Sequence, residues 1–398
     1  MKRLDVLDGM RGYFLVFMML NHLSFAGGYL LVKINHGELG YVQDAQGFVF
    51  LSGLLIGMVY AGHMAKRGYE AGSVKVRKRA LELYRWAMFC VLAIIALGFV
   101  LPRSGVFWEP WLWRLGDDPA LLFGAAATLL YQPTYMDILP QYIVYLLVSP
   151  PLIWLCVTGR WRMVALGSAL LWMAVQFGLH LPLRDAIHAG MQALHPDLAL
   201  RAHFNVLAWQ AIFMSGLVIG ALTATKEIDW DEAMSPKRPE FAVAALAIVL
   251  FFMAWRVAFT WGLVPEIMAQ RFGTLDIRGE FSLVYLLNFA ALGYLVAWTL
   301  IAGPRSESAV VRKIAAVPRA IFTLPFLRLI GRHSLQVYVW HVIAIYVLKA
   351  VDYHHGPFSE TNKTLIALAA IASLAVPALW REWRASVAKK DTVGAKAA

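Results

Sequence analysis

Ten stretches of this chain are apolar and long enough to cross a bilayer as a helix. A hydrocarbon core of about 30 Å takes roughly 20 helical residues, and backbone groups inside it must be satisfied by internal hydrogen bonds. Hydrophobic residues make up 60% of the 398 and charged residues 15%, and the mean hydropathy is +0.60. We therefore expect an all-α, polytopic integral membrane protein. The spans lie near residues 12–33, 46–64, 80–101, 135–157, 162–180, 204–224, 240–262, 281–302, 333–350 and 363–383.

A shorter apolar run at 119–131 is typical of a re-entrant segment or half-helix, which leaves eleven spans as the alternative count. No polar stretch is long enough to form a separate soluble domain. The sequence therefore predicts a single transmembrane domain over residues 1–385. The remaining polar segment, 386–398, is expected to be a disordered cytoplasmic tail.

The placement of basic residues predicts the orientation of the chain. Its net charge is +11, and most of the lysines and arginines fall on one side of the predicted spans. Because cytoplasmic loops of membrane proteins are enriched in Lys and Arg, both termini should be cytoplasmic. This placement favours lipid headgroups over nucleic acid as the partner of the basic residues. The densest clusters are Lys66, Arg67, Lys75, Arg77, Lys78 and Arg79, and later Arg305, Arg312, Lys313, Arg319, Arg328 and Arg332.

The sequence lacks the motifs of several common catalytic and nucleotide-binding sites. The phosphate-binding pattern GxxxxGK[ST], the dinucleotide pattern GxGxxG, and HExxH, CxxC and GxSxG are all absent. Cys90 and Cys156 fall in predicted spans without metal-type spacing, so we expect two buried apolar thiols and no metal site.

The first span, "DVLDGMRGYFLVFMMLNHLSF" at residues 5 to 25, contains an arginine and a histidine. Ionisable side chains such as these are unfavourable inside a bilayer. Arg11 and His22 are eleven residues apart, which is three helical turns plus about 20°, so they share one face about 16 Å apart. Asp8 lies on the same stripe and is expected to hold the Arg11 guanidinium. Such a stripe suits a long ligand with an anionic head at the cytoplasmic surface and a reactive end near the bilayer midplane. Ordinary positive-inside anchoring for Arg11 and a packed, neutral imidazole for His22 are the alternatives.

A second deep histidine lies in "GRHSLQVYVWHV". Ser334, Tyr338 and His341 recur at spacings of four and three and so share one helix face. Polar residues inside spans often mark a site, although each one alone is more typical of a helix-packing hydrogen bond. A buried Arg256 needs an anion, for which Glu266, Asp276 and Glu280 are candidates. The other polar residues in or near spans are Ser52, Asp137, Gln141, Asn205, Gln210 and Glu280.

The predicted outer loop "RSGVFWEPWLWRLGDDP" is rich in tryptophan. Trp108, Trp111 and Trp113 are typical of an interfacial aromatic belt. The alternative is a platform on which sugar rings stack.

The Arg11–His22 spacing resembles that of the acyltransferase-3 superfamily of membrane-bound acyltransferases. The segments "LDVLDGMRGYFLVFMMLNHL", "GFVFLSGLLIGMVY", "DILPQYIVYLLVSPPL", "NVLAWQAIFMSGLVIG" and "LIGRHSLQVYVWHV" are similar to its OpgC branch, in the same order over nearly the whole chain. That branch is associated with transfer of succinyl groups from cytoplasmic succinyl-CoA to osmoregulated periplasmic glucans. The resemblance therefore implies a multi-pass protein of the bacterial inner (plasma) membrane. The resemblance implies a catalytic role for His22 and a role in handling the acyl donor for Arg11.

Residues and resemblance together predict an acyl-transfer scheme. Acyl-CoA, a co-substrate and not a resident cofactor, would meet Asp8, Arg11 and Arg332 from the cytoplasm. His22 would act as general base, or as a covalent acyl carrier, while His341 or Tyr338 would hydrogen-bond the developing oxyanion. O-acetylation of another surface polysaccharide, a proton-coupled transporter and a non-catalytic scaffold are the competing functions. The residues expected to bind substrate are Ser52, Asp137, Gln210, Arg256, Glu280, Ser334 and Tyr338.

Overall fold

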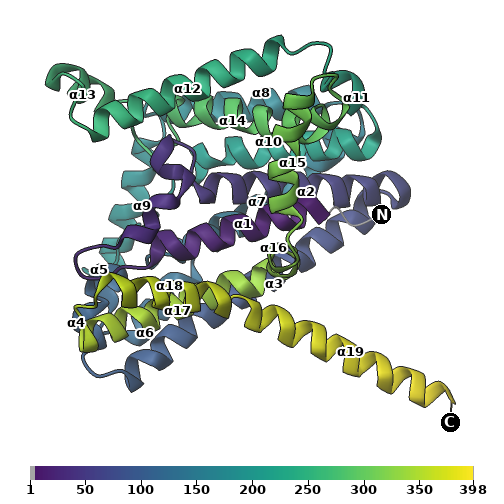
Figure 1. The fold of residues 1–398 in the computed structure, drawn as a ribbon. Helices are drawn as coiled ribbons and strands as arrows, with labels where there is room; N and C mark the ends of the chain where they lie inside the picture. The colour runs from purple at the N-terminus through teal and green to yellow at the C-terminus, as the bar shows by residue number, and fades with distance from the viewer. Residues whose placement is uncertain (1–4, 398) are drawn as a thin grey trace.

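The structure is a computed structural model that describes residues 5–397, all of them in helices or in the segments that join helices (Figure 1). Eight helical segments are long and apolar enough to cross a membrane, and up to ten if each of two bent helix pairs counts as one span. The prediction of an all-α, polytopic membrane protein is thus confirmed. The eight are α2 (Asp44–Arg67), α3 (Tyr69–Val100), α7 (Ile138–Val157), α10 (Val206–Thr225), α12 (Glu240–Thr260), α14 (Leu283–Ile301), α17 (Ser334–His355) and the segment of α18 (Glu360–Ser373) with α19 (Ala375–Ala397).

The two bent pairs are each a broken span or a re-entrant loop. The predicted span at 162–180 is α8 (Trp161–Gln176), which turns by 72° into α9 (Leu181–Leu194). Helices α15 (Ala309–Phe322) and α16 (Pro325–Arg332) meet at 52° where we expected only a connecting loop. A proline at the start of α9 and of α16 favours a new helix there, because its missing N–H and fixed φ suit a first turn.

The first helix is shorter than the predicted span of 12–33. Helix α1 (Asp5–His22) ends at His22, because the chain then turns through Gly27 and Gly28, both at positive φ. The next residues form the short helical turns η1 (Leu30–Ile34) and η2 (His36–Leu39). His22 therefore lies at the end of a helix and not in the middle of one.

The remaining elements are short. The apolar run at 119–131 contains the nine-residue helix α6 (Pro119–Ala127), in agreement with the half-helix prediction. The others are α4 (Ser104–Phe107), α5 (Glu109–Leu112), η3 (Trp113–Leu115), α11 (Trp230–Ala233), α13 (Glu266–Gly273) and η4 (Gly303–Arg305).

The C-terminal segment differs from its prediction. Residues 386–397, expected to be disordered, continue α19 as a helix to Ala397. Alanine and lysine are frequent here, and both are strong helix formers. Residue 398 lies outside the described part of the chain.

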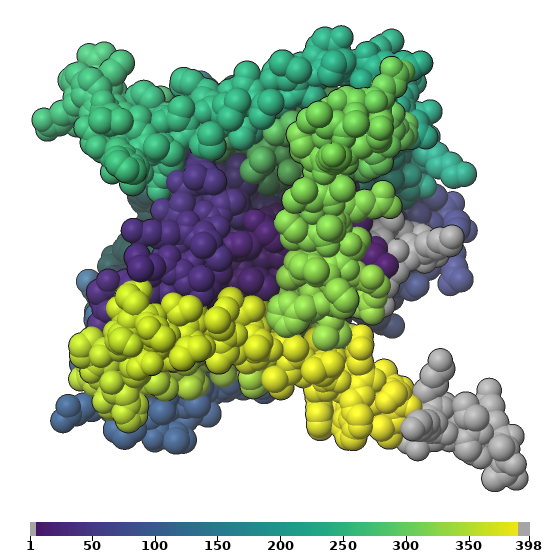
Figure 2. Space-filling model, in the orientation of Figure 1, coloured from purple at the N-terminus to yellow at the C-terminus, as the bar shows by residue number. Residues whose placement is uncertain are grey.

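The helices lie roughly parallel in layers (Figure 1). Helices α1, α2, α7 and α10 form the middle, with α12 and α14 on one side and α17 and α18 on the other. The N-terminus and the turn between α2 and α3 lie at one end of the bundle, and α4, α5 and α13 lie at the opposite end. Figure 2 shows α15 and α16 crossing the front of the molecule over the first helix.

Glycines let two helices of the middle layer touch backbone to backbone. Gly53 and Gly57 of α2 face Gly216 and Gly220 of α10. A Cβ at Gly57 would lie 2.1 Å from the carbonyl oxygen of Leu217, and one at any of the other three would lie within 2.3 Å of a facing oxygen. Membrane helices use small residues in this spacing to approach closely, because lipid provides no hydrophobic force between them.

This contact predicts a strong effect of a single methyl group. Gly57→Ala should destabilise the protein by about 1–3 kcal/mol, the usual cost of overpacking a filled interface. Gly62→Ala on the same helix is the matched control, because its Cβ would meet nothing closer than 3.8 Å. Thermal unfolding in detergent measures both variants. Equal shifts for the two would show that close approach of α2 and α10 does not govern stability.

Candidate active site

The two histidines singled out in the sequence meet in the structure. His22 at the end of α1 and His341 in α17 are 319 positions apart, and His22 Nδ1 lies 3.2 Å from His341 Nε2. Their ring centroids are 5.4 Å apart. His341 is fully buried and His22 is partly exposed, so the pair presents only His22 to a substrate.

The backbone of α17 sets which nitrogen of each ring carries a proton. His341 Nδ1 lies 2.5 Å from the carbonyl oxygen of Tyr338, which only accepts hydrogen bonds, so Nδ1 must donate. In a neutral imidazole the other nitrogen is then an acceptor, and His341 Nε2 accepts from His22 Nδ1. The remaining nitrogen, His22 Nε2, is left with a free lone pair. The arrangement is a relay that turns one imidazole into an oriented base.

Tyr135 covers the ring of His22. The two rings stack with centroids 4.2 Å apart, and the carbonyl oxygen of Tyr135 accepts a hydrogen bond of 2.7 Å from the Tyr338 hydroxyl. Tyr135 has φ of 70°, a conformation rare for a bulky residue. Such residues persist only where the surroundings hold them, often at functional sites. Sequence reasoning missed Tyr135, since nothing in its neighbourhood marks it.

The tryptophan-rich loop supports this stack and is neither a lipid-facing belt nor an open sugar platform. Trp108 and Trp111 are buried, because both pack on Tyr346 of α17, with centroids 5.2 and 4.9 Å away. Trp111 also meets Tyr135 edge-on at 5.2 Å. Trp113 is partly buried beneath the guanidinium of Arg114.

Arg11 lies on the other side of the histidine pair. Its guanidinium sits 5.6 Å from the ring of Phe48, which stacks in turn on Tyr338 at 6.4 Å. Arg11 Nε is buried without a hydrogen-bond partner among the described residues, and Arg79 of α3 is within electrostatic reach. A continuous row of side chains therefore joins Arg11 to the relay.

Asp8 lies within electrostatic reach of Arg11 and also faces a second arginine. Its carboxylate lies 3.9 Å from Nε of Arg332, because α16 crosses α1 at Gly331, where a Cβ would be 1.7 Å from the Asp8 carbonyl oxygen. Arg332 also lies 3.8 Å from Asp5 and 3.7 Å from Glu382. This network joins α1, α16 and α19 at the end of the bundle where the N-terminus lies.

Gln210 and Ser334 lie among residues that pack helices together. The Gln210 amide is used at both ends by Ser168, which donates to it at 2.7 Å and accepts from it at 2.8 Å. It therefore joins α10 to α8. Ser334 is buried at the first turn of α17, two turns from His341.

Arg256 and Glu280 do not pair, although the sequence made Glu280 a candidate anion. Arg256 lies over the ring of Tyr41 at 5.6 Å. Glu280 accepts from Asn205 Nδ2 at 2.7 Å and lies 3.6 Å from His180. Glu280 therefore fixes the segment before α14 to Asn205 and His180.

The sequence matches the family described as OpgC protein over residues 2–386. The chain belongs to this family. Its membership indicates an acyltransferase-type function for glucans. No curated protein and no solved structure matches the chain.

Ser52 lies in a part of this OpgC protein that holds two unpaired polar atoms. Ser52 Oγ and Gln141 Nε2 are buried without a hydrogen-bond partner among the described residues, and both line one small gap between α2, α7 and α10. Tyr142 lines the same gap. Unpaired buried groups are rare, and these two share one gap in the middle layer of helices.

A polar cluster that sequence reasoning missed lies beside the relay of this OpgC protein. Asp44 is 3% exposed and accepts hydrogen bonds from Asn21 at 2.5 Å and Asn35 at 3.2 Å. His36 lies 3.8 Å from Asp44, but burial lowers the pKa of His36 to about 4, so at neutral pH this contact is not an ion pair. Asp137, the residue before α7, which sequence reasoning did single out, is 9% exposed. Asn21 precedes His22, a signal that the sequence did contain.

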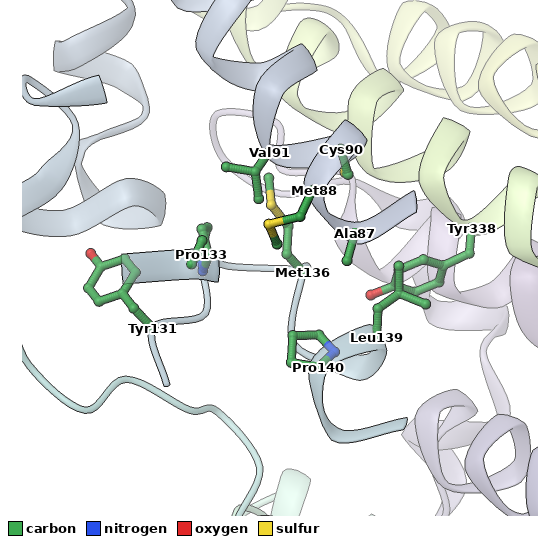
Figure 3. Close-up of a pocket in the computed structure, with 11 residues that line it drawn as sticks. Ala87, Met88, Cys90, Val91, Tyr131, Pro133, Met136, Leu139, Pro140 and Tyr338 are labelled. Carbon is green, nitrogen blue, oxygen red and sulfur yellow. The ribbon is translucent and has the colours of Figure 1, made fainter. Parts of the chain in front are cut away.

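A small apolar pocket lies next to Tyr338 (Figure 3). It is bounded by Cys90 and Met88 of α3 and by Met136 and Leu139, and its volume is about 10 Å³. That is space for about one water molecule, so it holds no acyl group in this conformation.

Metal ligands are not clustered in the described part of this OpgC protein. Residues 5–397 contain no group of three or more His, Cys, Asp or Glu side chains arranged to hold an ion. Cys90 and Cys156 are free and buried, as expected of apolar thiols.

Proposed function

We propose that this protein is a membrane-bound O-acyltransferase that moves a succinyl group from cytoplasmic acyl-CoA to a hydroxyl group of a periplasmic glucan. The observation that carries the proposal is the relay from Tyr338 through His341 to His22, which leaves His22 Nε2 as a free, oriented base beside a partly exposed surface. Family membership supports the acyl transfer and the glucan acceptor.

The donor would approach from the end of the bundle that carries the N-terminus. The basic residues Lys66, Arg67 and Arg77 lie at or near the turn between α2 and α3 at that end, as positive-inside orientation requires of a cytoplasmic face. Arg11 lies less than two helical turns from the start of α1 at this face and has a free donor for a phosphate or carbonyl of the CoA chain. The row through Phe48 and Tyr338 then leads toward His22.

The chemistry follows from the free lone pair. A glucan hydroxyl hydrogen-bonded to His22 Nε2 attacks the thioester carbonyl carbon, and the hydroxyl proton passes to Nε2 as the new C–O bond forms. The tetrahedral intermediate collapses with cleavage of the C–S bond. The thiolate of CoA takes the proton back, so His22 is neutral again. His341 holds the ring of His22 in the productive tautomer throughout.

Arg11 provides the test of the donor side. Arg11→Ala should weaken binding of the CoA donor by about 10- to 100-fold, because a hydrogen bond to a charged group contributes about 1.5–3 kcal/mol. Arg11→Lys should restore only part of the affinity, since the planar fork of the guanidinium is lost. Direct binding of CoA to detergent-purified protein measures both.

Arg160 supplies a matched control for that measurement. It is exposed at the start of α8, and its side chain forms no hydrogen bond or ion pair within the described residues, so Arg160→Ala should bind CoA as the unchanged protein does. Unchanged CoA affinity in Arg11→Ala would instead make Arg11 a packing partner of Phe48.

Mass spectrometry of periplasmic glucans tests the function as a whole. Glucans from cells that carry the intact protein should bear succinyl esters, and those from cells that lack it or carry His22→Gln should not. Acetyl esters in place of succinyl esters would show that the protein is an O-acyltransferase whose donor is acetyl-CoA and not succinyl-CoA. Identical glucans in all three strains would overturn the proposal.

A further inference from the structure

Acyl transfer of the proposed kind needs a group that stabilises negative charge on the carbonyl oxygen. The two groups expected from the sequence are already engaged. Both nitrogens of His341 are used within the relay, and the Tyr338 hydroxyl donates to the Tyr135 carbonyl oxygen while the residue is 1% exposed. The charge-stabilising group must therefore come from another element.

Arg278 is the cation that the fold brings toward His22. It lies in the segment before α14 and interacts electrostatically with His22, and also with Asp44 and Asp137. Its Nε is buried without a hydrogen-bond partner among the described residues. Within the same residues no carboxylate lies within 4.0 Å of its guanidinium. Its guanidinium carbon lies over the ring of Phe204, 5.5 Å from the ring centroid.

The main chain around Arg278 is held from several sides. Trp209 Nε1 donates to the carbonyl oxygens of Arg278 and Gly279 at 3.2 and 3.1 Å. The backbone N–H of Asn205 donates to Gly279 at 2.9 Å. Trp172 Nε1 donates to the Phe281 carbonyl oxygen at 2.8 Å. A loop anchored in this way keeps its arginine in place before a substrate arrives, which is what electrostatic catalysis requires.

The neighbouring arginine on this side of the bundle is already occupied. Arg201 donates to the carbonyl oxygens of Trp111 and Pro110 and to Thr134 Oγ1, at 2.7, 3.2 and 3.1 Å. It fastens the loop below Tyr135. Unlike Arg201, Arg278 thus has an unpaired donor, its Nε, among the described residues.

We propose that Arg278 is a further catalytic residue, whose guanidinium hydrogen-bonds the thioester carbonyl oxygen as it becomes the oxyanion. The assignment rests on the proposed function. When the glucan oxygen attacks, the carbonyl π electrons move onto this oxygen, and its new negative charge lies against a cation that keeps its proton. When the C–S bond breaks, the same electron pair re-forms the carbonyl. Proton transfer stays with His22.

Steady-state kinetics of Arg278→Lys and Arg278→Gln test the proposal, with acyl-CoA donor and purified glucan. Arg278→Gln should lower kcat by about 10²–10³-fold, the usual loss of one oxyanion donor, with KM for the donor little changed, because the interaction forms in the transition state. The fold-decrease in kcat should be the same with succinyl-CoA as with acetyl-CoA as the donor. Arg278→Lys should recover part of kcat, and free guanidinium ion should raise the rate of Arg278→Gln. Arg271→Gln, exposed on α13, is the control.

Three results would overturn it. A loss confined to KM for succinyl-CoA would make Arg278 a ground-state site for the carboxylate of the acyl group. An unchanged kcat in Arg278→Gln would remove it from the reaction. Equal loss in both variants, with lowered thermal stability and no guanidinium rescue, would make it structural. None of these three results changes whether the unchanged protein transfers acyl groups through His22. The proposed function is therefore tested independently of the role of Arg278.

Discussion

Replacing His22 with glutamine should lower acyl transfer to glucan by at least about 10²–10⁴-fold, the usual contribution of a general base. The glutamine amide can still donate to His341 Nε2 and fill similar space, but it cannot take a proton from the acceptor hydroxyl. The variant should insert in the membrane and purify as the unchanged protein does, because an uncharged side chain replaces a neutral imidazole. Transfer from labelled succinyl-CoA to purified glucan measures the loss.

His355→Gln is the matched control, since His355 is exposed at the end of the helix that carries His341. It should keep full activity. Near-normal glucan acylation by His22→Gln would mean that His22 is a packing residue and that the relay has no catalytic role.

The same protein can decide between direct transfer and an acyl-enzyme. Labelled acyl-CoA without acceptor should leave no stable label on the protein if the glucan oxygen attacks the thioester directly. Label that remains on the unchanged protein and is absent from His22→Gln would show that His22 Nε2 carries the acyl group between two half-reactions.

His341→Leu should lower kcat by about 10²–10⁴-fold, although His341 is fully buried and does not touch the substrate. Without an acceptor at its Nε2 position, His22 Nδ1 loses the partner that orients its ring and selects its tautomer. Loss of a tautomer-setting partner costs about 10⁴ in kcat in serine proteases. Kinetics of the purified variant measure the effect, with KM for both substrates expected to change little.

His341→Gln separates positioning from simple packing. Its amide oxygen can accept from His22 Nδ1, so it should retain clearly more activity than His341→Leu. Equal activity of the two variants would show that the polarity of residue 341 is irrelevant. It would also refute the relay as the device that frees His22 Nε2.

Hydropathy was enough to place most spans, because backbone hydrogen bonds in lipid leave the helix as the simplest solution. It misplaced the end of α1, since Gly27 and Gly28 leave the helix by their positive φ while the chain remains apolar. It also missed α15 and α16, whose arginines resemble those of a cytoplasmic loop.

Helical spacing was enough to put Arg11 and His22 on one face and to mark His341 as a second deep histidine. It said nothing about the 3.2 Å contact between two rings 319 positions apart, nor about which nitrogen carries the proton. The position of the proton depends on the backbone carbonyl group of Tyr338 in α17. Because every residue has a backbone carbonyl group, the sequence does not show which one will contact the ring.

The surroundings of the pair were also beyond sequence reasoning. Arg278 stands out in one way, as an arginine on the side where positive charge is rare, but its free guanidinium results from where Asn205 and Trp209 anchor its loop. Asp8 was assigned to Arg11 because the two share a helix face, and the sequence did not predict that Asp8 would also lie 3.9 Å from Arg332. Composition and periodicity determine which residues can lie in the membrane and on which face. Which partner satisfies each buried polar group is decided only by the packing of helices far apart in the chain, since that packing determines which donors and acceptors come within hydrogen-bond distance.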